Sequence, residues 1–372
     1  MDRVIEHKGI RKQRAVARSG RLRVFVSLCF INLLLLTGCS VIDEDLSDCG
    51  KEATVDYEVE LVTNMALELE MQLDALKDKE IIEGLRDYMS RIFTDHAYDV
   101  DLSFYDTQGD STRLLHDQHI MDANQRRYVL HLPINDYQHL AAANLLNNSQ
   151  VSLVDDARCH PSRLLQQRAD TIAPHTTGLF TARLPMRLVE NIDQTFFVRL
   201  YMANCASALV LDPRGRQPRD IRVVASGFAS QYQLCDSVYT FDAEPQVIKT
   251  DRLLSPTDPR ICYCTVNFPS RESGASLVRG AGDPTRTIIE TLAPFVSKPG
   301  EQSLWEYRVY VTNADGTVTE SIVGIREPLW AGQLKIVQVW VDDDGTVKSD
   351  LPEVGVSVTL DWKPGNVYHP NI

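Results

Sequence analysis

Residues 304–323, LWEYRVYVTNADGTVTESIV, consist of two runs of strand-forming residues on either side of the pair Asp315-Gly316. An Asp-Gly pair between two such runs supplies the positive φ angles that a tight hairpin turn needs. The tetrapeptide Asp-Gly-Thr-Val recurs at 344–347, after the β-rich run 334–341. The sequence therefore predicts antiparallel hairpins in this part of the chain.

Short runs of the same kind cover much of the sequence. They alternate apolar and polar residues, or they consist of β-branched and aromatic residues, as strands do. The runs are 55–61, 98–105, 127–132, 177–188, 195–211, 221–224, 238–241, 261–268, 304–312, 317–323, 334–341 and 354–360. Many short strands with frequent turns and few helices indicate a mainly β protein built of antiparallel sandwiches.

The first half of the chain also contains one helical pattern. Residues 67–92 place apolar side chains mostly three or four apart, which predicts a single helix. Residues 106–110, DTQGD, predict a hairpin-like turn. Residues 138–146 fit either a strand or a helix, and residues 155–170 fit a loop with a short helix.

We place a domain boundary near Glu190. Residues 53–189 and 190–372 are then two β-sandwich domains, and the alternating run 195–211 opens the second one. Both are of ordinary domain size.

The first 38 residues have the pattern of a bacterial lipoprotein signal peptide. Eight Lys and Arg residues lie within 1–23, and residues 24–36 are nearly all apolar but too few for a comfortable membrane span. Gly38 then precedes Cys39. The pattern predicts cleavage between these two residues and lipid on Cys39, with residues 39–52 as an acidic tether. An ordinary signal peptide, or a short anchor helix with an incidental cysteine, is the alternative.

The charge of the chain excludes some partners. Eight of its 38 Lys and Arg residues and two of its 51 Asp and Glu residues lie within 1–38, which leaves a net charge of −19 for residues 39–372. Such acidity argues against binding to nucleic acid and against electrostatic docking on anionic lipid.

Cysteine use fits an exported protein. Besides Cys29 and Cys39, six cysteines remain, and six allow fifteen disulfide pairings among which the sequence does not choose. They are Cys49, Cys159, Cys205, Cys235, Cys262 and Cys264. Cys262 and Cys264 are two residues apart in a predicted strand, so they share a face and are poorly placed to bond each other. Each therefore has a distant partner or stays buried and reduced.

No catalytic signature is present. The chain has no nucleophile elbow, phosphate loop, Rossmann glycine pattern or His-Glu-x-x-His helix. We predict that it is not an enzyme, and that it has neither a metal site nor a cofactor other than the covalent lipid.

Three weaker patterns have simpler interpretations. His116, His119 and His131 are better explained as surface histidines in a polar loop than as metal ligands. The run 342–345, DDDG, lacks the ligand spacing of an EF-hand and predicts a hairpin turn. Cys159-His160 has no evident third partner for a cysteine protease.

Asp170-Thr171-Ile172 and Asp236-Ser237-Val238 are similar to O-glycosylation sites of Bacteroides-type bacteria, although they also fit turn-to-strand junctions.

Residues 39–49, CSVIDEDLSDC, are the most specific segment of the mature chain. A cysteine after a signal peptide, a short spacer, Glu-Asp-Leu-Ser and a second cysteine resemble the start of the FimB-type fimbrial anchor lipoproteins of Bacteroides-type Gram-negative bacteria. The resemblance continues in order through the strand at Val55, the helix ending at Ile92 and the strand around Val198.

The resemblance implies two transthyretin-like, Greek-key β-sandwiches in tandem. It also implies an outer-membrane lipoprotein, carrying acyl chains such as palmitate on Cys39, at the base of a fimbrium. Its partners would be fimbrial shaft or accessory subunits, in a structure used for cell adhesion. Asp43, Glu44 and Asp45 are similar to the signal that sends such lipoproteins to the cell surface; taken alone, they form a solvated tether.

The last strand is a candidate for contact with a neighbouring subunit. Val354, Val356, Val358 and Leu360 lie on one face of it. Subunits of this type join by adding a strand to a partner's open sheet. The segment is then donated to a partner, or it forms the edge that receives a strand, or it is simply the last core strand.

A surface glycan-binding lipoprotein of a polysaccharide-uptake system is the alternative function. Such proteins usually expose clusters of Trp and Tyr, whereas this chain has four Trp, of which Trp305 and Trp340 lie within predicted strands.

Overall fold

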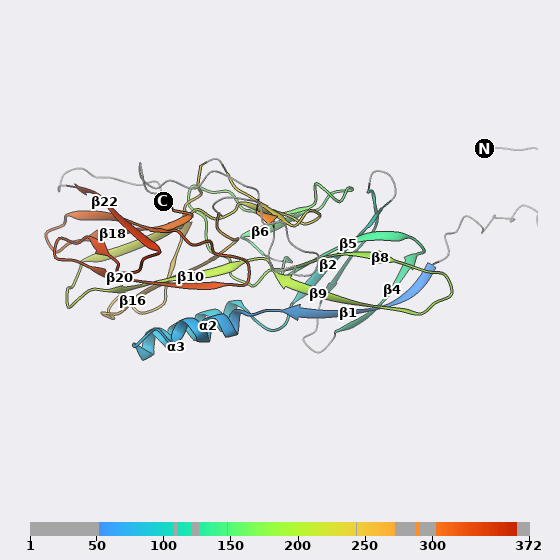
Figure 1. Ribbon diagram of the computed structural model, residues 1–372, viewed down its shortest axis with the longest axis horizontal. Helices are drawn as coiled ribbons and strands as arrows, with labels where there is room; N and C mark the ends of the chain where they lie inside the picture. Colours follow the sequence, from blue (N-terminus) through green and yellow to red (C-terminus); the bar gives the residue numbers. More distant parts are fainter. Residues whose placement is uncertain are drawn as a thin grey trace, which may run out of the picture. The chain divides into compact units, whose positions relative to one another are not determined.

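The computed structural model describes residues 52–107, 111–120, 126–146, 148–242, 244–271, 288–289 and 303–362. Half of these residues lie in strands, and two helices follow the first strand (Figure 1). In chain order the elements are β1 (Glu52–Val62), α2 (Met65–Leu73), α3 (Lys79–Ile92), β2 (Asp99–Asp106), β3 (Arg113–Ile120), β4 (Arg127–Pro133), β5 (Asp136–Ala143), β6 (Val151–Val154), β7 (Arg163–Gln166), β8 (Phe180–Arg187), β9 (Gln194–Met202), β10 (Cys205–Asp212), β11 (Asp220–Ser226), β12 (Gln231–Gln233), β13 (Val238–Thr240), β14 (Ile248–Lys249), β15 (Asp251–Arg252), β16 (Ile261–Asn267), β17 (Ile288–Ile289), β18 (Trp305–Thr312), β19 (Val318–Ile325), β20 (Leu334–Val341), β21 (Val347–Lys348) and β22 (Val354–Trp362). The predicted mainly β class is confirmed. Neither described helix is long and apolar enough to cross a bilayer.

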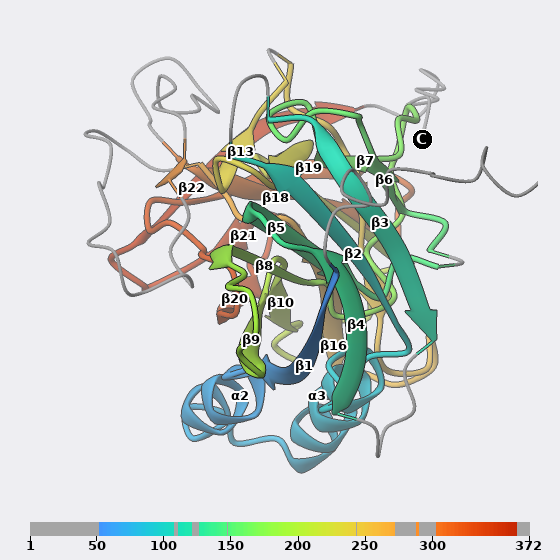
Figure 2. The ribbon, with the colours of Figure 1, turned by 90° about the vertical axis from the view of Figure 1, so that its right-hand side faces the viewer.

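Strand β1 lies inside a seven-stranded sheet of order β3-β2-β5-β8-β9-β1-β4. It pairs parallel with β9 and antiparallel with β4, and the three strands run side by side (Figure 2). Val55, Tyr57 and Val59 are buried in one apolar cluster with Leu102 of β2 and Ala141 of β5. The alternation predicted for β1 is confirmed, because successive residues of a strand point to opposite faces.

Two five-stranded sheets enclose a second core later in the chain. One has the order β15-β16-β10-β20-β21 and the other β14-β11-β18-β19-β22. Leu209 and Val337 from the first sheet belong to one apolar cluster with Tyr307, Val309 and Val323 from the second. These sheets form a β-sandwich, as predicted. Most neighbouring strands pair antiparallel, although β10 and β20 run parallel.

The predicted single helix at 67–92 is wrong, because the segment forms two helices. Helix α2 ends at Leu73 and α3 begins after Asp78. The Asp78 carboxylate accepts hydrogen bonds at 3.1 Å from the backbone N–H groups of Glu80 and Ile81. A side chain that caps the first free N–H groups in this way starts a new helix. The bend allows both apolar faces to lie on one surface.

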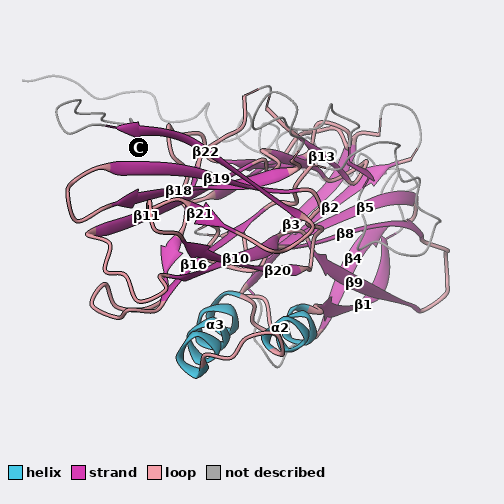
Figure 3. Cartoon of the chain, turned by 60° about the vertical axis from the view of Figure 1, so that its left-hand side comes forward, coloured by secondary structure: helices cyan, strands magenta, loops and turns pink. Residues whose placement is uncertain are grey.

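That surface belongs to the sheet that contains β10, β16 and β20 (Figures 1 and 3). Leu69 of α2 and Leu85 of α3 share an apolar cluster with Cys262, Cys264 and Leu334 from that sheet. A helix pair encoded in the first half of the chain thus covers a sheet built by the second half. This packing was not predicted.

Polar contacts hold the helix pair at the same place. The Tyr88 hydroxyl donates to Asp251 Oδ2 at 2.8 Å, and the Ile336 backbone N–H donates to Gln72 Oε1 at 3.3 Å. Arg260 also forms an ion pair with Glu80. These polar contacts fix the orientation of the helix pair on the sheet, because apolar packing alone is not directional.

The run 195–211 contains two strands that belong to different sheets. Strand β9 pairs with β1 and β8, whereas β10 joins the sandwich after the break at Ala203-Asn204. Strand β9 thus belongs to the seven-stranded sheet, where its parallel partner β1 lies far away in sequence. The division of the chain at Glu190 stays a prediction, and the described residues belong to one compact unit.

A fourth sheet, of order β17-β13-β12-β7-β6, joins strands from both halves. Strand β7 pairs antiparallel with β12, from Arg163 opposite Gln233 to Leu165 opposite Gln231. The prediction of a short helix within 155–170 is wrong, since this segment contains β7 and no helix. Of the ambiguous residues 138–146, residues 138–143 belong to strand β5.

Candidate interaction edge

Strand β22 ends one of the two sandwich sheets. It pairs antiparallel with β19 from Val354 opposite Ile325 to Trp362 opposite Val318. No other described strand pairs with it, since the sheet order closes with β19-β22. A strand with one unpaired side offers a row of N–H and C=O groups to which another chain can bind.

The predicted residues of this strand lie partly in the core. Val354 is buried, and Val356 is half-buried against the second apolar cluster. Val358 and Leu360 lie on the same strand, but their side chains fall outside the described residues. The first half of β22 therefore packs as a core strand.

The opposite face of this sheet is also covered. Ile322 and Ser357 are each 6% exposed, and Glu306 is fully buried. Burial raises the pKa of Glu306, although Arg308 donates to its Oε1 at 3.0 Å and opposes that shift. In the described first half of β22, residues 354–357, both faces are buried or half-buried, so the backbone edge is the part of this half that is left for a partner.

The proposed lipid site is not described by the structure. Gly38, Cys39, Asp43, Glu44, Asp45 and Cys49 lie outside the described residues. The signal peptide and the tether remain predictions from sequence.

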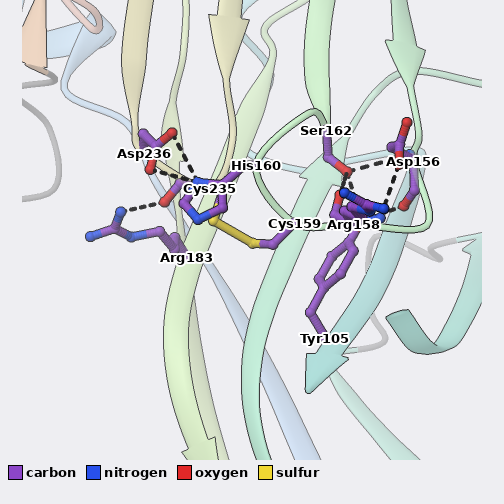
Figure 4. The surroundings of a disulfide bond; sticks show 9 residues. All are labelled: Tyr105, Asp156, Arg158, Cys159, His160, Ser162, Arg183, Cys235 and Asp236. Atoms are coloured by element: carbon purple, nitrogen blue, oxygen red, sulfur yellow. Dashed lines mark hydrogen bonds and ion pairs between the residues drawn. A yellow bond between two sulfur atoms is a disulfide. The ribbon is translucent and has the colours of Figure 1, made fainter. Parts of the chain in front are cut away.

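Five of the six remaining cysteines lie within the described residues. Cys159 and Cys235 form a disulfide with a Cα–Cα distance of 5.6 Å (Figure 4). Cys205, Cys262 and Cys264 are reduced and buried. The sequence left two options for Cys262 and Cys264, a distant partner or a buried and reduced thiol. Both cysteines are buried and reduced.

The disulfide also excludes a thiolate metal ligand at Cys235 and a nucleophilic thiol at Cys159. His160 lies beside it and forms an ion pair with Asp236 at 3.3 Å. Within the described residues, His160, Cys235 and Asp236 are the one group of potential metal ligands. The Cys235 sulfur is bonded to Cys159, so it is not a thiolate ligand, and Cys159 is not a free nucleophile.

The other predicted histidines do not gather. His116 Nε2 lies 2.7 Å from Asp101 Oδ2, and His131 Nδ1 lies 3.4 Å from the Thr54 hydroxyl. The side chain of His119 falls outside the described residues. The expectation of a polar loop is wrong, because these histidines lie on strands β3 and β4.

Both Asp-Gly-Thr-Val segments form turns, as predicted. Gly316 and Gly345 adopt φ angles of +85° and +81°. Asp315 and Asp344 each accept a hydrogen bond at 2.9 Å from the backbone N–H two residues later. These aspartates therefore stabilise hairpin turns.

The two potential glycosylation segments differ in exposure. The Thr171 hydroxyl is buried and has no hydrogen-bond partner. Ser237 is half-exposed in the turn before β13, with a φ of +56°. The Thr171 hydroxyl is therefore not accessible to a modifying enzyme in the folded protein.

The tryptophans do not form an exposed platform in the part of the chain that the structure describes. Trp305 is fully buried and donates to the Glu327 carbonyl at 3.0 Å. Trp340 is half-exposed, with the Arg214 guanidinium 4.2 Å from its ring centroid. The arrangement differs from the exposed aromatic clusters expected for sugar stacking.

Comparisons with known protein-family models and with curated proteins find no match. Among solved structures, the chain is similar to a candidate adhesin from Bacteroides ovatus, at 10% identity over 85% of this chain and 97% of that one, with a TM-score of 0.47. It is also similar to the fimbrial anchor protein Mfa2 from Porphyromonas gingivalis, at 10% identity over 69% of this chain and 78% of that one, with a TM-score of 0.39. A candidate polysaccharide-binding protein from Bacteroides thetaiotaomicron matches at 11% identity over 70% and 76% of the two chains, with a TM-score of 0.42.

Proposed function

We propose that this protein is an outer-membrane lipoprotein that anchors a fimbrium to the cell surface and contacts fimbrial subunits without catalysing a reaction. Lipid on Cys39 would hold it in the membrane, since several acyl chains together give near-permanent attachment. The observation that carries the proposal is strand β22, which ends its sheet with one side unpaired among the described residues.

The contact with a fimbrial subunit is strand addition at the β22 edge. Main-chain hydrogen bonds to an added strand bring affinity, and alternate side chains bring fit. We infer that β22 receives a strand and is not itself donated. Its departure would break the pairing with β19 and uncover Val354 and Val356, which pack on the sandwich core.

The anchoring role is tested with Cys39→Ala. Intact cells carrying the wild type or this variant are treated with a membrane-impermeant crosslinker. We expect crosslinks between the wild type and fimbrial subunits, and fimbriae released into the medium by the variant. Crosslinking to a transporter would instead favour glycan capture, and no labelling from outside would contradict surface exposure.

The edge is tested separately with Val356→Asp and Val358→Asp. Because Val356 packs on the sandwich core, we expect lower stability, so fimbria retention is compared under conditions where circular dichroism shows that the variant is folded. A folded variant should no longer retain fimbriae, and a folded variant that retains them would contradict the edge contact. Lys348→Glu, which changes a charge on the edge strand β21 of the other sandwich sheet, is the matched control and should retain fimbriae.

A further inference from the structure

One end of the seven-stranded sheet gathers the start of β1 and three connections between strands, β2–β3, β4–β5 and β8–β9. Glu52, the first residue of β1, pairs with Pro133 at the end of β4. The loop 188–193 connects β8 to β9 at this same end, since Gln194 pairs with Val55 near the start of β1 (Figure 1). The chain therefore enters the described structure beside this loop.

The loop 188–193 carries two exposed apolar side chains. Val189 is 39% exposed and Ile192 is 56% exposed. The loop is held in shape, because the Val189 backbone N–H donates to Gln194 Oε1 at 2.8 Å and Gln194 Nε2 donates to the Arg187 carbonyl at 3.0 Å. Two exposed apolar side chains on a loop of fixed shape leave apolar area that a contact would remove from water.

The covalent chain limits how far this loop can lie from a bilayer. Residues 40–51 connect Cys39 to Glu52, and an extended chain of that length spans at most about 45 Å. We propose that loop 188–193 touches the lipid surface through Val189 and Ile192, as a second and shallow contact beside the acyl chains. This inference rests on the proposed lipid at Cys39.

The tether makes a weak contact sufficient. When one site is already attached, the second contact forms within the same complex, at an effective concentration on the order of millimolar for a short linker. Two half-exposed side chains need not bind the free protein to a membrane; they need only favour one orientation of a protein that is already held there.

Charge specifies the kind of lipid surface. Glu190 and Asp193 lie in the loop, and Glu52 and Asp136 begin the neighbouring strands. Arg187 lies close to one of them, with its Nε 3.6 Å from Asp136 Oδ1. Because the end is acidic, it fits zwitterionic headgroups and is repelled by anionic ones.

The test uses the lipid-carrying full protein in phosphatidylcholine vesicles that contain a photoreactive phosphatidylcholine. After illumination, mass spectrometry maps the labelled peptides. We expect label on the peptide that contains loop 188–193, and about a tenfold loss of that label in Val189→Ser/Ile192→Ser, since each change removes apolar area from the contact. Leu67→Ser is the matched control: Leu67 is 63% exposed on α2, and the control should label the loop as the wild type does.

Each outcome decides a different statement. Label confined to residues 40–51 would overturn the loop contact and leave the lipid anchor standing. Loop label that persists in the double variant would overturn the role of Val189 and Ile192. Equal loop label in phosphatidylglycerol vesicles would overturn the preference for zwitterionic lipid. A protein that is not retained on vesicles would refute the anchor itself, and the loop contact with it.

Discussion

Removal of the Cys159–Cys235 disulfide should destabilise the protein strongly. The bond joins residues 76 apart in sequence and connects the segment before β7 to the β12–β13 hairpin. In the chain-entropy model, a crosslink that closes a loop of this length restricts the unfolded chain by about 4.5 kcal/mol at 25 °C. We expect a loss of about 3–4 kcal/mol for Cys159→Ala/Cys235→Ala, because native and residual structure reduce the ideal value.

The assay is unfolding in guanidinium chloride, with and without a thiol reductant, followed by the midpoint and the slope of the transition. Reductant should lower the midpoint of the wild type towards that of the double variant. It should leave the double variant unchanged, because Cys205, Cys262 and Cys264 are already reduced and buried. A loss below about 1 kcal/mol would refute the claim that this bond restricts the unfolded chain.

Three further predictions concern the rest of the chain. Residues 53–189 and 190–372 expressed as separate fragments should not fold, because β9 pairs with β1 and the helix pair covers the second sandwich; soluble fragments with native-like circular dichroism would contradict this. Burial lowers the pKa of His139 to about 4 and that of His175 to about 3, so below the ordinary value of 6.5 the unfolded chain binds protons that the folded chain does not. Stability should therefore fall as the pH drops from about 6.5 towards 4, by about 2 kcal/mol per histidine at pH 5, measured by chemical unfolding at each pH. Gly227→Ala should cost about 3 kcal/mol or more in the same assay, because φ is +97° and the added Cβ would lie 2.6 Å from a backbone atom of β18.

Two variants serve as controls for these measurements. Gly316 has a φ of +85° but no atom within 4 Å of an added Cβ, so Gly316→Ala should show strain without a clash and a smaller loss. His131→Gln changes an exposed histidine and should leave the pH dependence of stability unaltered. An equal loss at both glycines, or an altered pH slope in the histidine control, would contradict the structural explanation.

The sequence predicted those elements whose signal is local. The hairpin at 304–323 followed from strand runs around Asp315-Gly316, and the alternation of 354–360 predicted β22. The break between α2 and α3 also had a local signal, because Asp78 is a good N-cap residue at the start of the second apolar stripe. The continuous spacing of apolar residues through 67–92 concealed it.

Long-range pairing left no such signal. Strand β9 alternates like any half-buried strand, and nothing within it shows that its partner β1 lies near the start of the chain. The partner of Cys159 was one among five other cysteines. The candidate site was predicted in part: the pattern of β22 identified a strand, but only the sheet order shows that it lies at an edge.

The position of α2 and α3 has a consequence for how the chain reaches its folded state. If the protein is exported N-terminus first, the helix pair emerges well before β10, β16 and β20, the strands that it covers. Its apolar stripe, which includes Leu69 and Leu85, then has no surface to pack on until most of the chain has crossed the membrane. Contacts so distant in sequence form slowly and leave aggregation-prone surface exposed in the meantime. A chaperone on the far side of the membrane would therefore have to shield this helix pair until those strands arrive.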